Sequence, residues 1–337
     1  MDTADDNLTT FNATLDYNWS PDNFYDHYSD SITQKTVITL FSIVFVLGII
    51  GNGLVIWIAG FRMKNTISAV WFLHLAIADF LCCASLPLRI VNWNMFFINL
   101  SYCILNMFLF NLNVTTSVLL LMAMSIDRWV SVMWPIWAKV HRTCKLVNVT
   151  AAIIWGMSLI VTGLVFYVYG IYVGGLDEWC FYLYFINYYN PDLYQPIQLI
   201  RLLIMCVIPF LIIFTSYVTI FYKLRKSKRS RRSQRSSRII TAVILCFFIC
   251  WFPYYIWPLT DRDKLHDFQY YTVHTIVIIL AYVNSCMNPI IYVFMSPDFQ
   301  QGFFRSIPYR LERALGENSN DLSRHRKNTG NTHTTDV

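Results

Sequence analysis

The stretch Thr36–Gly60, TVITLFSIVFVLGIIGNGLVIWIAG, contains no charged side chain and is long enough to cross a membrane. An α-helix needs about 20 mostly apolar residues to span the hydrocarbon core of a bilayer. Within lipid the backbone must satisfy its own hydrogen bonds, and a helix does so inside one segment. Six further stretches are similarly long and mostly apolar: Ser68–Leu88, Tyr102–Val132, Leu146–Tyr169, Ile197–Tyr222, Ile239–Leu259 and Tyr270–Met295. The sequence therefore predicts an all-α bundle of seven transmembrane helices.

The composition agrees with a surface that faces lipid. Of the 337 residues, 56% are hydrophobic and only 14% are charged, whereas soluble domains carry about 25% charged residues. The apolar stretches do not alternate between polar and apolar residues over segments of about ten residues, which excludes a transmembrane β-barrel.

Basic residues predict the orientation of the bundle. The segment Lys223–Arg238 is rich in Lys and Arg and has no acidic residue, whereas the loop Asp177–Pro196 has neither Lys nor Arg. By the positive-inside rule the basic segment is cytoplasmic, so we expect a multi-pass plasma-membrane protein with an extracellular N-terminus. The net charge of +6 then reflects topology beside anionic lipid, and nucleic acid is not an expected partner. Residues 1–34 lack the pattern of a cleavable signal peptide, so the first helix is expected to direct insertion.

The chain divides into four predicted parts. Residues 1–35 form an acidic extracellular tail, and residues 36–297 form the helical bundle. Residues 298–315 have phenylalanines spaced as in a short amphipathic helix eight on the inner membrane surface. Residues 316–337 are polar and are predicted to be disordered.

The N-terminal tail has glycosylation motifs at Asn7, Asn12 and Asn18, which suit the extracellular side. Its tyrosines lie beside or near aspartates. Two interpretations remain open. The tail is either a solvated acidic segment or an anionic patch that attracts a cationic ligand. In the second interpretation its tyrosines can be sulfated.

Of the nine cysteines, Cys103 and Cys180 fall in the oxidising surroundings outside the membrane, so we expect a disulfide between them. The other cysteines lie mostly within the helices. Around Cys180, the segments Val168–Val173 and Trp179–Phe185 flank two glycines. That pattern predicts a β-hairpin over the outer end of the bundle.

Asp79 lies in the middle of the second predicted helix, where a charge is costly and usually functional. Polar side chains on other helices can meet it: Asn52, Asn113, Ser117, Asn284 and Asn288. One carboxylate with several neutral oxygens suits a small hard cation such as Na⁺. The alternative is a hydrogen-bonded polar core without an ion. We expect no other cofactor and no further metal.

Asp127 and Arg128 lie at the inner end of the third predicted helix. The aspartate can hold its neighbouring arginine inward until a partner protein binds, or Arg128 can be an arginine that snorkels to the interface. Pro253 and Pro289 lie within the sixth and seventh predicted helices. A proline removes a backbone donor and kinks a helix, so each is a candidate hinge.

These motifs together resemble the rhodopsin-like, or class A, G-protein-coupled receptors. They occur in the family's order as Leu75–Asp79, Cys103 with Cys180, Asp127–Trp129, Cys250–Pro253 and Asn288–Tyr292. The resemblance covers about 36–310, and Trp129 departs from the family's usual tyrosine. It implies coupling to a heterotrimeric G protein of the inhibitory class through Asp127, Arg128, Tyr217 and Tyr292. It also implies arrestin binding after phosphorylation of the C-terminal tail.

A narrower resemblance is to the receptors for chemoattractant peptides. Gly51–Trp57, Trp71–Leu75 and Ala78–Pro87 are similar to the anaphylatoxin receptors, and His74 with Cys82-Cys83 is most like the complement component 3a receptor. That resemblance implies a peptide or small-protein ligand in chemotaxis and inflammation. The outer loop is shorter than in mammalian component 3a receptors, and His274 stands where an aspartate is common.

Arg201 is the sharpest candidate for a ligand contact. It lies two turns before Pro209 in the outer half of the fifth predicted helix. A guanidinium that faces the bundle can bind the C-terminal carboxylate of a peptide bidentately. The alternative is an arginine that snorkels to the interface. The predicted ligand-binding set is Arg201, Asn111, His274 and Trp251.

Three functions are weighed from these residues. A signalling receptor for component 3a is the leading hypothesis, with formyl-peptide, chemerin or component 5a receptors as alternatives. A scavenger receptor that binds without signalling is the second. A transporter or enzyme is the third, and the chain lacks the zinc-protease and phosphate-loop motifs that would favour an enzyme.

Overall fold

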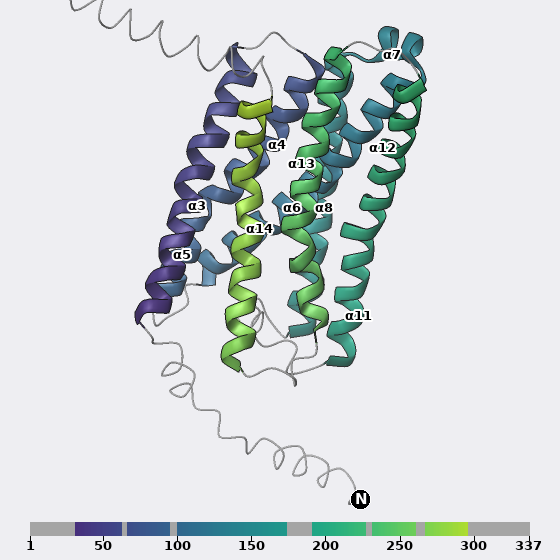
Figure 1. The fold of residues 1–337 in the computed structure, drawn as a ribbon. Coiled ribbons are helices and arrows are strands. Elements are labelled where there is room, and N and C mark those ends of the chain that lie inside the picture. The colour runs from purple at the N-terminus through teal and green to yellow at the C-terminus, as the bar shows by residue number, and fades with distance from the viewer. Residues whose placement is uncertain are drawn as a thin grey trace, which may run out of the picture.

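The computed structural model describes residues 31–62, 66–94, 100–173, 191–226, 231–260 and 267–295. Seven helices in these ranges are long and apolar enough to cross a membrane: Thr33–Phe61, Ile67–Val91, Ser101–Met133, Cys144–Val168, Gln195–Lys223, Ile240–Leu259 and Thr272–Ile291. They lie alongside one another as an elongated bundle (Figure 1). The predicted fold class, an all-α bundle of seven spans, is confirmed.

Several spans consist of more than one helical element. The first is α3 (Ser31–Trp57) with the π-helical η1 (Ile58–Arg62), and the second is α4 (Ile67–Ala84) with α5 (Leu86–Asn94). The third is α6 (Leu100–Met133), followed by the short α7 (Pro135–His141), and the fourth is α8 (Cys144–Val173). The fifth joins α11 (Pro191–Leu202), the π-helical η2 (Leu203–Val207) and α12 (Ile208–Lys226). The sixth is α13 (Arg231–Ile256) with η3 (Trp257–Leu259), and the seventh is α14 (Asp267–Met295).

Prolines account for two of the interruptions. The second span breaks at Ser85, whose backbone N–H and hydroxyl both bond to the carbonyl of Cys82, because Pro87 cannot continue the regular hydrogen-bond ladder. In the fifth span the π-helical turn η2 ends just before Pro209. Widened turns of this kind absorb a missing backbone donor within a membrane helix.

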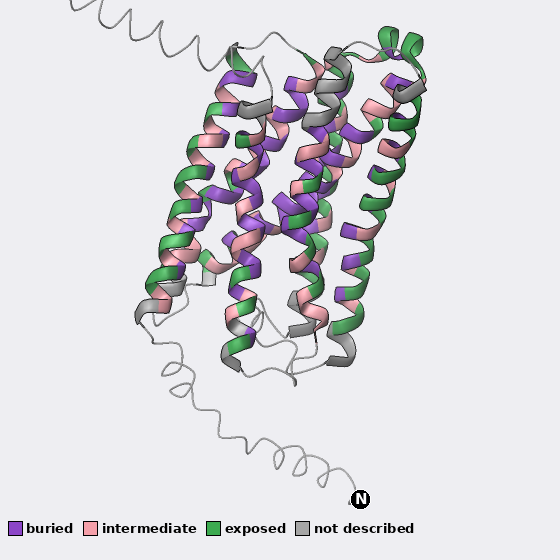
Figure 2. Ribbon diagram, viewed as in Figure 1, coloured by how far each residue is buried: buried purple, intermediate pink, exposed green. Residues whose placement is uncertain are grey.

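Burial separates a packed interior from an apolar outer surface. Figure 2 shows buried residues on the faces that point into the bundle and exposed residues along the outer faces of α3 and α12. The largest fully buried side chains include Trp251, Tyr282 and Phe41. The outer face of α8 exposes Ile153 and Ile160. Apolar side chains exposed in this way need lipid as their solvent, which explains the low charge content.

Figure 1 shows α7 at one end of the bundle and α11 at the other; we call these the α7 end and the α11 end. In the predicted orientation the α7 end is cytoplasmic. The first helix begins at Ser31, within the segment predicted as tail. The glycosylation motifs at Asn7, Asn12 and Asn18, the helix at 298–315 and the tail at 316–337 lie outside the described residues.

One prediction of secondary structure is wrong. The segment Val168–Val173 was expected to form the first strand of a hairpin, but it is the last part of helix α8. Because its residues continue the long apolar run of the fourth span, the helix extends through them in place of a strand. The second expected strand, Trp179–Phe185, lies outside the described residues.

Gly48 is a position where the packing requires the absence of a side chain. A Cβ atom there would lie 2.2 Å from Cys83 Sγ and 3.4 Å from Cys286 Sγ. We expect Gly48→Ala to destabilise the bundle by about 1–3 kcal/mol, the usual cost of overpacking a core. A lower melting temperature of the purified protein would show this. Gly156→Ala is the matched control, because its Cβ would meet no atom within 4 Å, and equal losses in both variants would contradict the prediction.

Candidate functional sites

Arg201 points into the bundle and contacts two other helices. It lies in the last turn of α11, and its Nη2 donates to Oδ1 of Asn111 on α6 at 3.1 Å and to the hydroxyl oxygen of Tyr254 on α13 at 2.8 Å. Its guanidinium carbon is 4.9 Å from the ring centroid of Tyr254 and 5.6 Å from that of Tyr255. A guanidinium held by two rings and an amide does not snorkel outward, so the interior placement of Arg201 is the one observed.

Arg201, Asn111, Tyr254 and Tyr255 are called the Arg201 cluster below. Trp251 contacts this cluster through the ring of Tyr254. Its side chain is fully buried, 5.5 Å from the ring of Tyr254 and 5.2 Å from that of Phe110. Phe110 also packs 4.9 Å from Tyr282 on α14. A change at Arg201 therefore reaches α13 and α14 through ring contacts. Trp251, which precedes the helix-interior proline Pro253, connects the predicted ligand site to the predicted hinge.

His274 belongs to a second aromatic group at the α11 end. Its ring stacks parallel to that of Tyr270, one turn earlier in α14, with the ring centroids 6.4 Å apart. The ring of Tyr270 lies 5.1 Å from that of Trp257 in η3. Of the four predicted ligand residues, the structure thus joins Arg201 to Asn111 directly and Trp251 to them through Tyr254. It places His274 among different rings.

Tyr254 and Tyr255 were missed by the sequence analysis, although the rings of both contact Arg201. A helical spacing of three or four places side chains on one face, so Tyr254 and Tyr255 follow Trp251 on the same side of α13. This spacing was the available signal. The sequence could not show that both rings turn toward α11.

Asp79 is buried and is hydrogen-bonded by two of its predicted partners. Asn113 Nδ2 donates to Oδ1 at 3.0 Å, and Asn288 Nδ2 donates to Oδ2 at 2.8 Å. Ser117 follows Asn113 by one turn of α6, and Asn284 precedes Asn288 by one turn of α14, so both share the faces that carry these donors. The structure therefore brings α4, α6 and α14 together at this carboxylate.

Several oxygens on these faces of α6 and α14 are buried without a hydrogen-bond partner. They are Oδ1 of Asn113, Asn284 and Asn288, and Oγ of Ser117. Buried polar atoms are usually paired, and neutral oxygens beside a carboxylate are the ligands that hard cations prefer. The residues present thus fit a sodium ion. Asn52 instead donates to the carbonyls of Gly48 and Ser285, at 3.0 and 2.8 Å.

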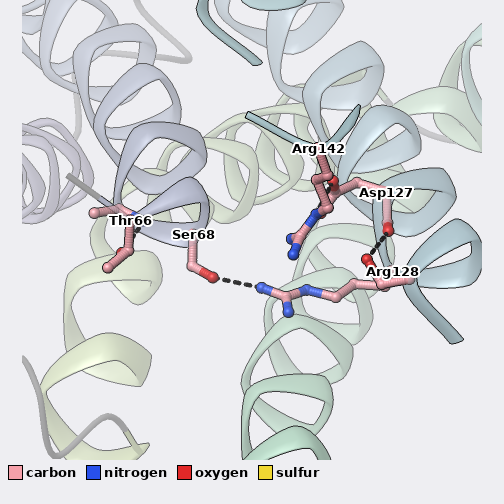
Figure 3. Close-up of polar contacts among 7 residues, drawn as sticks. Thr66, Ser68, Asp127, Arg128 and Arg142 are labelled. Carbon is pink, nitrogen blue, oxygen red and sulfur yellow. Dashed lines mark hydrogen bonds and ion pairs between the residues drawn. The ribbon is translucent and has the colours of Figure 1, made fainter. Parts of the chain in front are cut away.

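The predicted pairing of Asp127 with Arg128 is wrong. Arg142, at the end of α7, donates from Nε and Nη2 to the two carboxylate oxygens of Asp127, each at 2.5 Å. Arg128 extends across to α4, where Nη2 donates to Ser68 Oγ at 2.5 Å (Figure 3). Adjacent residues on a helix point in different directions, so Asp127 faces α7 while Arg128 faces α4. The sequence analysis did not single out Arg142.

The two remaining residues of the predicted coupling set are tyrosines. Tyr217 lies in α12 and packs against the hydrophobic core. Tyr292 lies in α14, and its side chain is outside the described part of the chain.

Cys103 at the start of α6 is disulfide-bonded, as predicted. The other described cysteines are free thiols: Cys82, Cys83, Cys144, Cys206, Cys246, Cys250 and Cys286. The predicted partner of Cys103 is Cys180, which lies outside the described residues. The pairing itself therefore stays a prediction.

The chain is similar to known receptors over most of its length. The profile of the family "7 transmembrane receptor (rhodopsin family)" matches residues 51–292. Formyl peptide receptor 2 of Mus musculus is 34% identical, with 93% of this chain and 94% of that protein covered. N-formyl peptide receptor 2 of Homo sapiens is 34% identical, covering 89% and 92%. The C3a anaphylatoxin chemotactic receptor of Danio rerio is 31% identical, covering 95% and 89%. Because the family profile matches residues 51–292 and the described residues contain seven spans, the chain belongs to the rhodopsin family of seven-transmembrane receptors.

Proposed function

We propose that this protein is a signalling receptor for a chemoattractant peptide whose C-terminal carboxylate binds Arg201. The contact of Arg201 with Asn111 and Tyr254 carries the proposal, because it fixes a guanidinium inside the bundle at the α11 end. A guanidinium offers a carboxylate two parallel N–H donors. The hydroxyl of Tyr254 is a third donor within the same cluster. The membership in a receptor family supports a protein that is not an enzyme.

Several ligand classes remain candidates for this site. The sequence motifs favour component 3a, and the similarity to the Danio rerio C3a anaphylatoxin chemotactic receptor supports it. The similarity to formyl peptide receptors, at 34% identity, favours a formyl peptide. A chemerin or component 5a receptor is an alternative of the same cluster. All of these ligands are peptides or small proteins, and the recognition of a free C-terminus by Arg201 is the common element.

Binding at the α11 end is proposed to act through the rings below Arg201. A ligand that displaces Tyr254 or Trp251 changes the packing around Pro253 and favours a state in which the α7 end opens beside Arg128. A G protein of the inhibitory class binds that state, and the two binding events strengthen each other by linkage. The proposal also includes arrestin binding after phosphorylation of the C-terminal tail. It places the N-terminus outside the plasma membrane.

The experiment is a calcium response in transfected cells, with each candidate peptide supplied as a free acid and as a C-terminal amide. We expect a response to at least one free acid and a large loss of potency for its amide, because the amide removes the charge that Arg201 binds. Equal potency of acid and amide would contradict the carboxylate site. Binding without any response would favour the scavenger receptor instead.

Sodium is proposed as an allosteric ion at Asp79, held with Asn113, Ser117, Asn284 and Asn288. A ligand present at about ten times its dissociation constant stabilises the folded protein by about 1.4 kcal/mol. We therefore expect NaCl to raise the melting temperature of the purified receptor relative to choline chloride at equal ionic strength. Asp79→Asn keeps the shape and removes the charge, so the sodium effect should vanish. An undiminished effect in the variant would remove the ion from this site.

A further inference from the structure

Both carboxylate oxygens of Asp127 are occupied by a residue that is distant in sequence. Arg142 donates Nε to Oδ1 and Nη2 to Oδ2, each at 2.5 Å. The Arg142 and Asp127 side chains are 20% and 11% exposed, so water competes little with the pair. Two parallel N–H···O bonds make this one of the stronger and more directional arrangements of guanidinium and carboxylate.

The short helix α7 holds Arg142 in place. The backbone N–H of Arg142 donates to the carbonyl of Ala138 at 3.0 Å, and Ala138 is buried. The ring of Trp134, just before α7, meets that of Trp129 on α6 edge to face at 5.0 Å. Arg142 therefore approaches Asp127 from a helix that is itself packed against α6.

Arg128, the neighbour of Asp127, makes its contact on a different helix. Its Nη2 donates to Ser68 Oγ, near the start of α4, and its Nε is buried without a hydrogen-bond partner. Figure 3 shows the side chain of Arg128 extended across to Ser68, with Arg142 on the side of Asp127. A neutral hydroxyl binds a guanidinium more weakly than a carboxylate does. Arg128 thus bonds to the weaker acceptor, the Ser68 hydroxyl, while Arg142 occupies the stronger acceptor, the Asp127 carboxylate.

We propose that Arg142 is a positioning residue for Arg128. By occupying Asp127, Arg142 prevents the carboxylate from drawing Arg128 back against its own helix. Arg128 then stays extended across the α7 end, where a partner protein can reach it. A carboxylate cannot accept a bidentate pair from two arginines at once, so Arg142 and Arg128 compete for Asp127. Loss of Arg142 shifts that competition toward Arg128.

This inference rests on the proposed coupling to a G protein for its functional test. Nucleotide exchange on an inhibitory-class G protein is measured with the purified full-length receptor in lipid nanodiscs, with and without an active peptide. Arg142→Gln is expected to lower both rates roughly two- to thirtyfold, the usual range for residues that modulate coupling. Lys139→Gln is the matched control, because it removes the same charge from the exposed face of α7 and should leave both rates unchanged.

A double variant separates positioning from other roles of Arg142. Asp127→Asn removes the charge that competes for Arg128, so Arg142→Gln in the Asp127→Asn background should cost little or nothing. If Arg142 instead contacts the G protein, or only supports folding, the loss should persist in that background. Persistence of the loss, or no loss in Arg142→Gln alone, overturns the inference.

The position of Arg128 is a readout that needs neither ligand nor G protein. A cryo-EM structure of the Arg142→Gln receptor should show the Arg128 guanidinium on Asp127 and away from Ser68. If Arg128 remains on Ser68, the inference fails whatever the signalling data show. If Arg128 moves but the unmodified receptor supports no nucleotide exchange with any peptide, the inference holds and the proposed function fails.

Discussion

Replacing Arg201 with alanine is expected to lower peptide potency by about 100-fold or more while surface expression stays unchanged. Truncating one partner of a buried, hydrogen-bonded charge pair costs about 2–5 kcal/mol or more, largely because the other charge is left unpaired. In the proposed complex the ligand carboxylate is that other charge. The measurement is a concentration–response curve for the active peptide, with cell-surface receptor quantified by antibody labelling of the N-terminal tail.

Two further variants define what Arg201 contributes. Arg201→Lys keeps a cation but loses the planar fork, so we expect a loss of potency between that of the alanine variant and none. Lys35→Ala removes an exposed cation from the first turns of α3 and should have little effect. An alanine variant at Arg201 with unchanged potency would remove this residue from the ligand site. So would a loss that does not depend on whether the peptide is an acid or an amide.

Replacing Arg128 with alanine is expected to lower ligand-driven nucleotide exchange strongly while peptide binding is retained. Arg128 extends from α6 across the α7 end to Ser68, where it presents the guanidinium that the G protein is proposed to meet. Its loss removes the charge from the coupling site without touching the Arg201 cluster. We expect at least a tenfold fall in the ligand-driven exchange rate, which corresponds to about 1.4 kcal/mol or more of lost coupling.

The comparison for Arg128→Ala is Lys145→Ala, which removes an exposed cation near the start of α8. Peptide affinity without G protein is measured for both variants to show that the α11 end is intact. Normal exchange in Arg128→Ala would contradict the proposed coupling site. A parallel loss of exchange and of G-protein-independent peptide affinity would indicate a folding defect, and then the melting temperature should fall as well.

The seven spans could be predicted because the physical constraint acts on each segment alone. A run such as Thr36–Gly60 must be helical in lipid whatever its neighbours do, and α3 with η1 covers it. Boundaries were less accurate where the constraint weakens. At Val168–Val173 the residues suited a strand as well as a helix, and the continuity of α8 decided in favour of the helix.

The candidate sites were predictable to the extent that a buried charge has few acceptable partners. Asn113 and Asn288 donate hydrogen bonds to Asp79 as expected, because the neighbouring spans place these amide donors at the same depth as the carboxylate. Side-chain direction was not predictable. Arg128 and Asp127 are adjacent in sequence, so a pair seemed natural, yet they lie on different faces of α6. The position of α7, which the sequence does not fix, decides which arginine reaches Asp127.

The most direct test of a signalling receptor is ligand-driven nucleotide exchange with purified components. The receptor in lipid nanodiscs is mixed with an inhibitory-class G protein, and the exchange rate is followed on adding component 3a, component 5a, chemerin or a formyl peptide. We expect at least one of these ligands to accelerate exchange in the unmodified receptor and not in Arg201→Ala. Specific binding of any of them with no acceleration of exchange would contradict the account.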